Sequence, residues 1–103
     1  MIGVALSVVL KAKPGKEQDV AEFLRSARSV VEQEDGTRAW FALQFDDSTF
    51  GIFDVFPDDD ARRAHLAGGV GQALAAQGAE LFSAEPAIQS TDVLAYKLPG
   101  DIG

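Results

Sequence analysis

Three stretches of this sequence alternate as β-strands do, yet they are apolar on both faces. In Val4–Lys11 the first charged residue is Lys11, and Thr37–Phe45 and Thr49–Phe56 place large apolar side chains on both parities. A sheet with helices on one face normally has a polar second face. Leaving an apolar one in water would exceed the patch size that monomers tolerate. We therefore expect a second copy of the chain to cover it as a symmetric partner. The alternative is that the extra aromatic side chains only thicken the core of one protomer.

Helical patterns separate these strands. Apolar residues recur at helical spacing from residue 16 to about residue 34, and Gly36 is expected to close this helix as its C′ glycine. A second helical region covers about residues 58–66, where acidic residues at its start favour a helix N-terminus. After a glycine-rich break, a short further helix is expected over residues 70–81, and the last strand over residues 88–98.

The order β-α-β-β-α-(α)-β contains no repeat or linker. A split βαββαβ arrangement gives a four-stranded antiparallel sheet with helices on one face and the first and third strands at its centre. The length of 103 residues suits a single domain. We therefore predict an α+β, ferredoxin-like domain over residues 1–98 and a tail over residues 99–103.

Composition narrows the function classes. The net charge of −7 argues against nucleic acid and against anionic membrane surfaces, because both are bound mainly through Lys and Arg. The absence of cysteine excludes disulfides, thiolate metal sites and cysteine nucleophiles. The first residues run directly into a strand pattern without a basic leader, and no apolar run has the length of a membrane span. These features favour the cytoplasm, with no membrane partner.

Several segments resemble the antibiotic biosynthesis monooxygenase family. Val4–Gly15 resembles its first strand and Pro-Gly turn, and Glu34-Asp35-Gly36 followed by Trp40 resembles its E-x-G…aromatic step into the second strand. Thr49–Phe56, an acidic loop and Ala64-His65-Leu66 resemble its F-x-x-x-E-x-W…A-H-L segment. The order and spacing of these motifs carry the resemblance, which spans residues 4–98.

The resemblance implies a dimeric α+β barrel that oxidises a quinol-like or aromatic polyketide substrate with O₂, without metal or flavin. Phe56 stands where a Trp is common and Asp54 where a Glu is common, so Asp54 reaches less far toward a substrate. A haem-degrading branch of the fold depends on a histidine in the later helical region. Residues 69–77 contain none, which argues against haem.

His65 and Asp54 are the expected catalytic residues. His65 is the only histidine, and its ordinary pKa of about 6.5 suits a general base that deprotonates a phenol or quinol before O₂ reacts. Asp54 is expected to orient the ring, because a carboxylate on an apolar strand face needs a partner. Two alternatives stay open. The histidine–carboxylate bond is only structural, or Asp54 pairs with Arg62 or Arg63 instead.

Four aromatic residues are the expected substrate-binding residues, since ligand sites are mostly apolar with few polar groups. Their alternative role is packing in the core and in the dimer interface. The four are Trp40, Phe41, Phe53 and Phe56.

Two further motifs are assigned to local structure. Gly68-Gly69-Val70-Gly71 lacks the Lys-Ser/Thr of a P-loop and is interpreted as a helix break. Asp58-Asp59-Asp60 lacks the spaced ligands of a calcium loop and is interpreted as a helix cap. No residues have the spacing of zinc or iron ligands. The alternative to an enzyme is a non-catalytic, dimeric small-ligand-binding or scaffold domain of the same fold.

Overall fold

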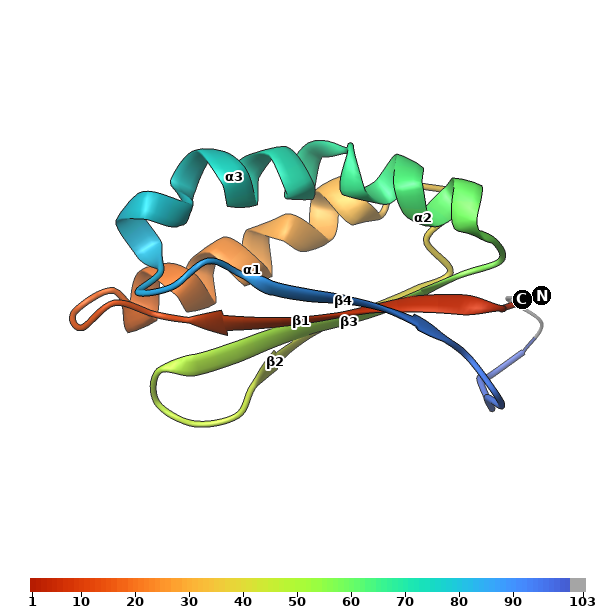
Figure 1. Cartoon of the computed structure of the whole chain (residues 1–103), viewed down its shortest axis with the longest axis horizontal. Helices are drawn as coiled ribbons and strands as arrows, with labels where there is room; N and C mark the ends of the chain where they lie inside the picture. The colour runs from red at the N-terminus through yellow and green to blue at the C-terminus, as the bar shows by residue number, and fades with distance from the viewer. Residues whose placement is uncertain (101–103) are drawn as a thin grey trace.

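A computed structural model describes residues 1–100, in which three helices cover one face of a four-stranded antiparallel sheet (Figure 1). The predicted α+β, ferredoxin-like class is confirmed. The elements are β1 Val4–Lys11, α1 Glu17–Val31, β2 Ala39–Gln44, β3 Thr49–Phe56, α2 Asp59–Leu66, α3 Gly69–Leu81 and β4 Ala87–Asp92.

The strands lie in the order β2-β3-β1-β4, so β1 and β3 are central, as predicted. Asp54 of β3 lies opposite Leu6 of β1 on one side and Trp40 of β2 on the other. Directly paired residues share a face of the sheet. Asp54 therefore sits among apolar side chains on the face that the helices cover.

The core lies between this face and the helices. α1 buries one stripe of side chains at helical spacing, among them Val20 and Leu24, while α3 buries Val70 and Leu74. They pack against alternate residues of the central strands such as Phe50, which is 2% exposed. This two-layer arrangement fixes which parity of each strand faces the helices.

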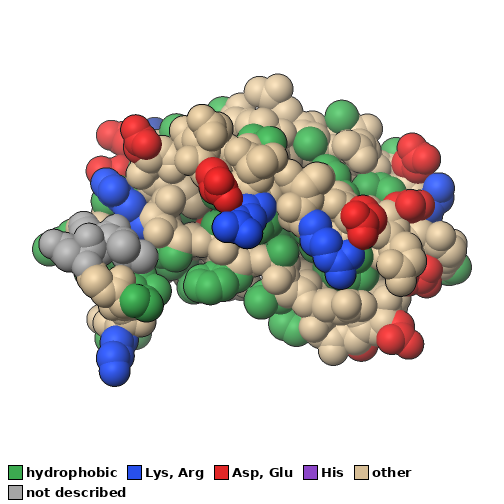
Figure 2. Space-filling view, turned by 180° about the vertical axis from the view of Figure 1, so that it is seen from behind, with side chains coloured by type: hydrophobic (Ala, Val, Ile, Leu, Met, Phe, Trp, Pro, Cys, Tyr) green, Lys and Arg blue, Asp and Glu red, His purple; other side chains and the backbone are tan. Residues whose placement is uncertain are grey.

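The opposite face of the sheet is only partly covered. The segment after β4 folds under one end, where Val93 and Leu98 pack against Ile2, Ala5 and Val55 (Figure 1). Seen from behind, charged side chains of both signs lie across the helical layer, whereas hydrophobic side chains gather lower down, toward the sheet (Figure 2). The exposed apolar side chains of this open face are Val9, Phe41, Leu43 and Phe53, with Phe45 just beyond β2.

The last strand is shorter than predicted. β4 ends at Asp92 instead of residue 98 because Asp92 lies opposite Val4, where β1 begins. One further backbone hydrogen bond joins the Val93 N–H to the Gly3 carbonyl. Beyond it the chain has no neighbouring strand with which to pair.

The role predicted for Gly36 is wrong. α1 ends at Val31, and Gly36 does not have the positive φ of a C′ glycine. Its hydrogen instead gives room to α2, since a Cβ on Gly36 would lie 2.9 Å from the Cβ of Ala61. No helix within residues 1–100 is long and apolar enough to cross a membrane. In the predicted tail, residues 101–103 lie outside the described residues.

Candidate functional site

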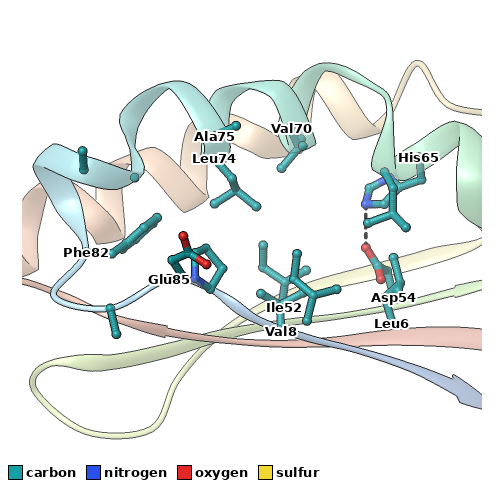
Figure 3. Close-up of a pocket in the computed structure, with 17 residues that line it drawn as sticks. Leu6, Val8, Ile52, Asp54, His65, Val70, Leu74, Ala75, Phe82 and Glu85 are labelled. Atoms are coloured by element: carbon teal, nitrogen blue, oxygen red, sulfur yellow. Dashed lines mark ion pairs between the residues drawn. The ribbon is translucent and has the colours of Figure 1, made fainter.

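A cavity of about 700 Å³ lies between α3 and the sheet (Figure 3). Its floor is formed by apolar side chains of the strands, including Leu6, Val8 and Ile52. Its roof includes small residues of α3, among them Ala75 and Gly78. Because these side chains end close to the helix backbone, they leave the space below α3 unfilled. The volume falls within the range of about 300–1,000 Å³ that is usual for small-molecule sites.

Asp54 and His65 lie together at one end of this cavity (Figure 3). The Nε2 of His65, on α2, lies 2.9 Å from Oδ2 of Asp54, on β3. Its Nδ1 lies 2.5 Å from Oε1 of Glu34, in the loop after α1. Thr37 donates its hydroxyl to the same glutamate oxygen at 2.7 Å. The imidazole is thus held between two carboxylates, so the protonated ring can donate from both nitrogens.

The two buried groups influence each other's ionisation. Burial raises the pKa of the Asp54 carboxyl, and the hydrogen bond and charge of His65 oppose it only in part. Burial lowers the pKa of His65, but the hydrogen bonds to Asp54 and Glu34 and their negative charges outweigh burial and leave the pKa raised. Both shifts favour protonation, so the folded site holds a proton more tightly than the separated groups would.

One oxygen of Asp54 is left free. Oδ1 is buried and has no hydrogen-bond partner among residues 1–100, although the residue is only 1% exposed. Buried carboxylate oxygens normally have a partner, since an unsatisfied one is costly. The Nε1–H of Trp40, across the strand pair, is also buried without a partner in the described chain. The cavity therefore ends beside a buried carboxylate whose second oxygen has no hydrogen-bond partner in the described chain.

The four aromatic residues take different places. Phe41 and Phe53 lie on the open face of the sheet, 48% and 39% exposed. Trp40 lies on the helix-covered face and packs against the core. Phe56 is fully buried, with its ring centre 5.2 Å from that of His65. Within residues 1–100, none of the four is among the residues that line the cavity.

The arginines do not contact Asp54. Arg62 and Arg63 both bind the Asp59 carboxylate, and Arg62 also donates to the backbone carbonyls of Ala5 and Thr91. Asp58 caps α2 by accepting the Ala61 N–H at 2.9 Å, as the acidic run predicts. In the described part of the chain, no group of three or more His, Asp or Glu side chains is arranged to hold a metal ion.

Sequence reasoning paired His65 with Asp54 but did not assign a role to Glu34. The available signal is the Glu34-Asp35-Gly36 segment, whose resemblance to a family motif does not by itself show what Glu34 contacts. Three elements that are distant in sequence meet here, and no local spacing connects Glu34 with His65, 31 residues later. The wall formed by α3 is not predicted by the sequence either, because small residues on a helix do not by themselves indicate a cavity.

Comparison with solved structures identifies the relatives of this chain. The NE2512 protein of Nitrosomonas europaea, a protein of unknown function, is 50% identical to it, with 97% of each chain covered and a TM-score of 0.95. The chain belongs to the family of the NE2512 protein. Neither a family model nor a curated protein matches the sequence.

Two solved structures of lower sequence identity are similar to this chain in fold alone. A Caulobacter crescentus protein provisionally named an antibiotic biosynthesis monooxygenase is 15% identical over 91% of this chain and 92% of its own, with a TM-score of 0.78. A Nitrosomonas europaea protein with the same provisional name is 16% identical over 89% and 90%, with a TM-score of 0.79. The family of NE2512 therefore has the fold of the antibiotic biosynthesis monooxygenases, and the resemblance noted in the sequence is confirmed at that level.

Proposed function

We propose that this chain is a small monooxygenase that oxidises a quinol-like or hydroxylated aromatic molecule with O₂ in the cavity beside Asp54. The observation that carries the proposal is the unpartnered, buried Oδ1 of Asp54 at the end of an otherwise largely apolar cavity. A flat apolar molecule suits the walls, and its hydroxyl would donate to Oδ1 once a small side-chain movement uncovers that buried oxygen. The fold shared with the provisionally named monooxygenases supports the same reaction class.

In this proposal Asp54, and not His65, accepts the substrate proton. Both nitrogens of His65 face carboxylate oxygens, so the ring has no free acceptor for a substrate hydroxyl. Burial raises the pKa of Asp54, which makes it a stronger base than an exposed aspartate. His65 is a positioning residue that holds the carboxylate and offsets its charge, and Glu34 holds His65 in turn.

The chemistry balances without a separate reductant. Deprotonation gives an electron-rich aryloxide that can transfer electrons to O₂. For a hydroquinone, one oxygen atom of O₂ enters the ring and the other leaves as water, so hydroquinone and O₂ give a hydroxyquinone and water. The substrate supplies all four electrons. The work of the protein is to bind, orient and deprotonate the substrate in a largely apolar cavity.

The test combines oxygen uptake with binding. A panel of benzene and naphthalene hydroquinones is offered to the protein in an oxygen electrode, and binding is measured separately by anaerobic calorimetry. Asp54→Asn keeps the size of the side chain but removes the base, so turnover should fall about 100-fold or more. Asp60→Asn, on an exposed residue of α2, is the matched control and should keep full activity.

Each remaining outcome has a defined meaning. Full turnover in Asp54→Asn would remove Asp54 from the mechanism. If compounds of the panel bind but none supports oxygen uptake, the enzyme proposal is wrong and the chain is the non-catalytic ligand-binding domain. The largely apolar cavity is the observation that favours that second candidate.

We further propose that the chain works as a homodimer through the open face of its sheet. Val9, Phe41, Leu43 and Phe53 are each 37–48% exposed on this face. Burying apolar area is worth about 25 cal/mol per Å², so leaving these side chains in water forgoes substantial stabilisation. A second copy offers the same face in return, as two-fold symmetry requires.

A further inference from the structure

Acidic groups mark the two ends of the cavity. Asp54 and His65 stand at one end, and Glu85, in the loop between α3 and β4, lies away from them on the side of Phe82 (Figure 3). Among the described residues that line the cavity there is no Lys or Arg, so His65 is the only positive group. Its charge is already matched, because its two ring nitrogens face Glu34 and Asp54.

The spacing of the two ends follows from the strand register. Asp54 lies opposite Leu6 of β1, and Ala87 of β4 lies opposite Val9. Three residues of strand separate these levels, which corresponds to about 10 Å. Glu85 precedes Ala87 by two residues and so lies beyond that level. A molecule that donates a hydroxyl to Asp54 and extends along the cavity therefore brings its far end toward Glu85.

The charges along the cavity disfavour a ligand whose far end is anionic. An anionic group near Glu85 would meet a like charge without a cation among the lining residues to offset it. Moving such a group from water into a largely apolar cavity adds a desolvation cost. An uncharged far end avoids both penalties. A cationic far end would pair with the Glu85 carboxylate, which is exposed enough for its partner to stay partly hydrated.

We propose that Glu85 is a specificity-determining residue that selects hydroxylated aromatic ligands with an uncharged or cationic far end and rejects anionic ones. This inference rests on the proposed function, because it takes Asp54 as the anchor of the ligand hydroxyl. It goes further by stating which charge the far end of the ligand can carry and which residue selects it. Carboxylated and phosphorylated aromatics are excluded as substrates.

The test uses three naphthalenes that share one hydroxyl end and carry a neutral, anionic or cationic group at the other. These are naphthalene-2,6-diol, 6-hydroxy-2-naphthoic acid and 6-(aminomethyl)-2-naphthol, titrated anaerobically into the purified protein at pH 7.5 by calorimetry. The diol and the amine should bind at least about tenfold more tightly than the acid. This difference in affinity should narrow at high salt, since Glu85 is exposed and its charge is screened.

Variants of Glu85 assign the effect to this residue. Glu85→Gln should shrink the gap between acid and diol, and Glu85→Lys should reverse the order of acid and amine. Asp47→Lys is the control, because Asp47 lies in the β2–β3 hairpin loop and the substitution changes the net charge equally. It should leave the ranking unchanged.

The outcomes separate this inference from the proposed function. If the three naphthalenes bind wild-type protein equally, or if Asp47→Lys changes the ranking as much as Glu85→Lys does, charge selection by Glu85 is overturned while the cavity remains a ligand site. If none binds, the ligand class fails as well, and both proposals fall together.

Discussion

His65 is held between two carboxylates, so the charge on its ring depends on both. Asp54 is expected to act on the substrate, whereas Glu34 contacts only His65 and Thr37 through its Oε1 atom. A positioning role for Glu34 therefore has a specific signature, which is the pKa of the histidine. Because the chain has a single histidine, its ring signals can be followed without ambiguity.

Replacing Glu34 with Gln should lower the pKa of His65. The amide keeps the shape of the side chain but removes one of the two negative charges that hold the pKa up. An NMR titration of the ring carbon signal measures the shift directly. Asp35→Asn, on the exposed neighbouring residue, is the control and should leave the titration unchanged. An unaltered His65 pKa in Glu34→Gln would show that Asp54 alone sets it.

The stability of the protein should fall as the pH rises above neutrality. The pKa of His65 is raised above its ordinary value of 6.5, so at higher pH the folded chain binds more protons than the unfolded chain. The free energy of unfolding then decreases with pH. The contribution is complete below pH 6.5 and is lost as the pH passes through the folded-state pKa. Urea titrations between pH 6 and 9 should show this slope in the wild type, and an identical slope in His65→Gln would assign it to Asp54, whose pKa burial also raises.

At the site, the sequence predicted the contact between His65 and Asp54 but not its surroundings. His65 stood out as the lone histidine and Asp54 as the lone charge on an apolar strand face, and such isolated features are visible in a sequence. Glu34 is one of 16 acidic residues, and nothing local distinguishes it. The choice of Asp54 as base needs the contacts of both ring nitrogens, which only a folded structure provides.

Among the elements, those with a strong period were the most predictable. β1 and β3 begin and end where their alternation predicted. The last strand is shorter than predicted because its alternating pattern continues past Asp92, whereas its length is set by where β1 begins. The prediction for Gly36 is wrong because a glycine after a helix usually closes it, whereas here the glycine makes room for α2, a contact between distant elements that the local sequence does not show.

The junction of α2 and α3 depends on one glycine. A Cβ on Gly71 would press on the carbonyl oxygen of Leu66, a backbone atom that cannot rotate away. Gly71→Ala should therefore lower the free energy of unfolding by about 1–3 kcal/mol, as overpacking does. The measurement is urea denaturation followed by circular dichroism.

Gly78→Ala is the matched control on the same helix. A Cβ there meets only the ring of Phe82 at 3.6 Å, an ordinary contact. Because alanine favours a helix interior over glycine, this variant should gain up to about 1 kcal/mol. Equal losses from both substitutions would mean that α3 tolerates no added volume, and that the Leu66 contact is not special.

For the whole molecule, the helices bury one sheet face and leave the other incomplete. Val93 and Leu98 cover one end of the open face, and the aromatic side chains at the other end remain exposed. The sequence alone predicted this imbalance, because apolar residues of both parities are visible without a structure. The part of the open face that stays exposed could not be predicted, since it depends on how the segment after β4 folds back.

In the proposed homodimer, Phe53→Lys should separate the two copies into monomers. Phe53 lies on central strand β3, facing outward and 39% exposed, so a charge there would be buried without a partner at a two-fold interface. Light scattering after size-exclusion chromatography at micromolar concentration measures the mass.

Val30→Lys is the matched control, because Val30 is 41% exposed on α1, in the helical layer, and a lysine there should leave the dimer intact. A wild-type protein that elutes at the mass of one chain, 10.9 kDa, would contradict the dimer. Dissociation by both variants would place the interface on more than the sheet.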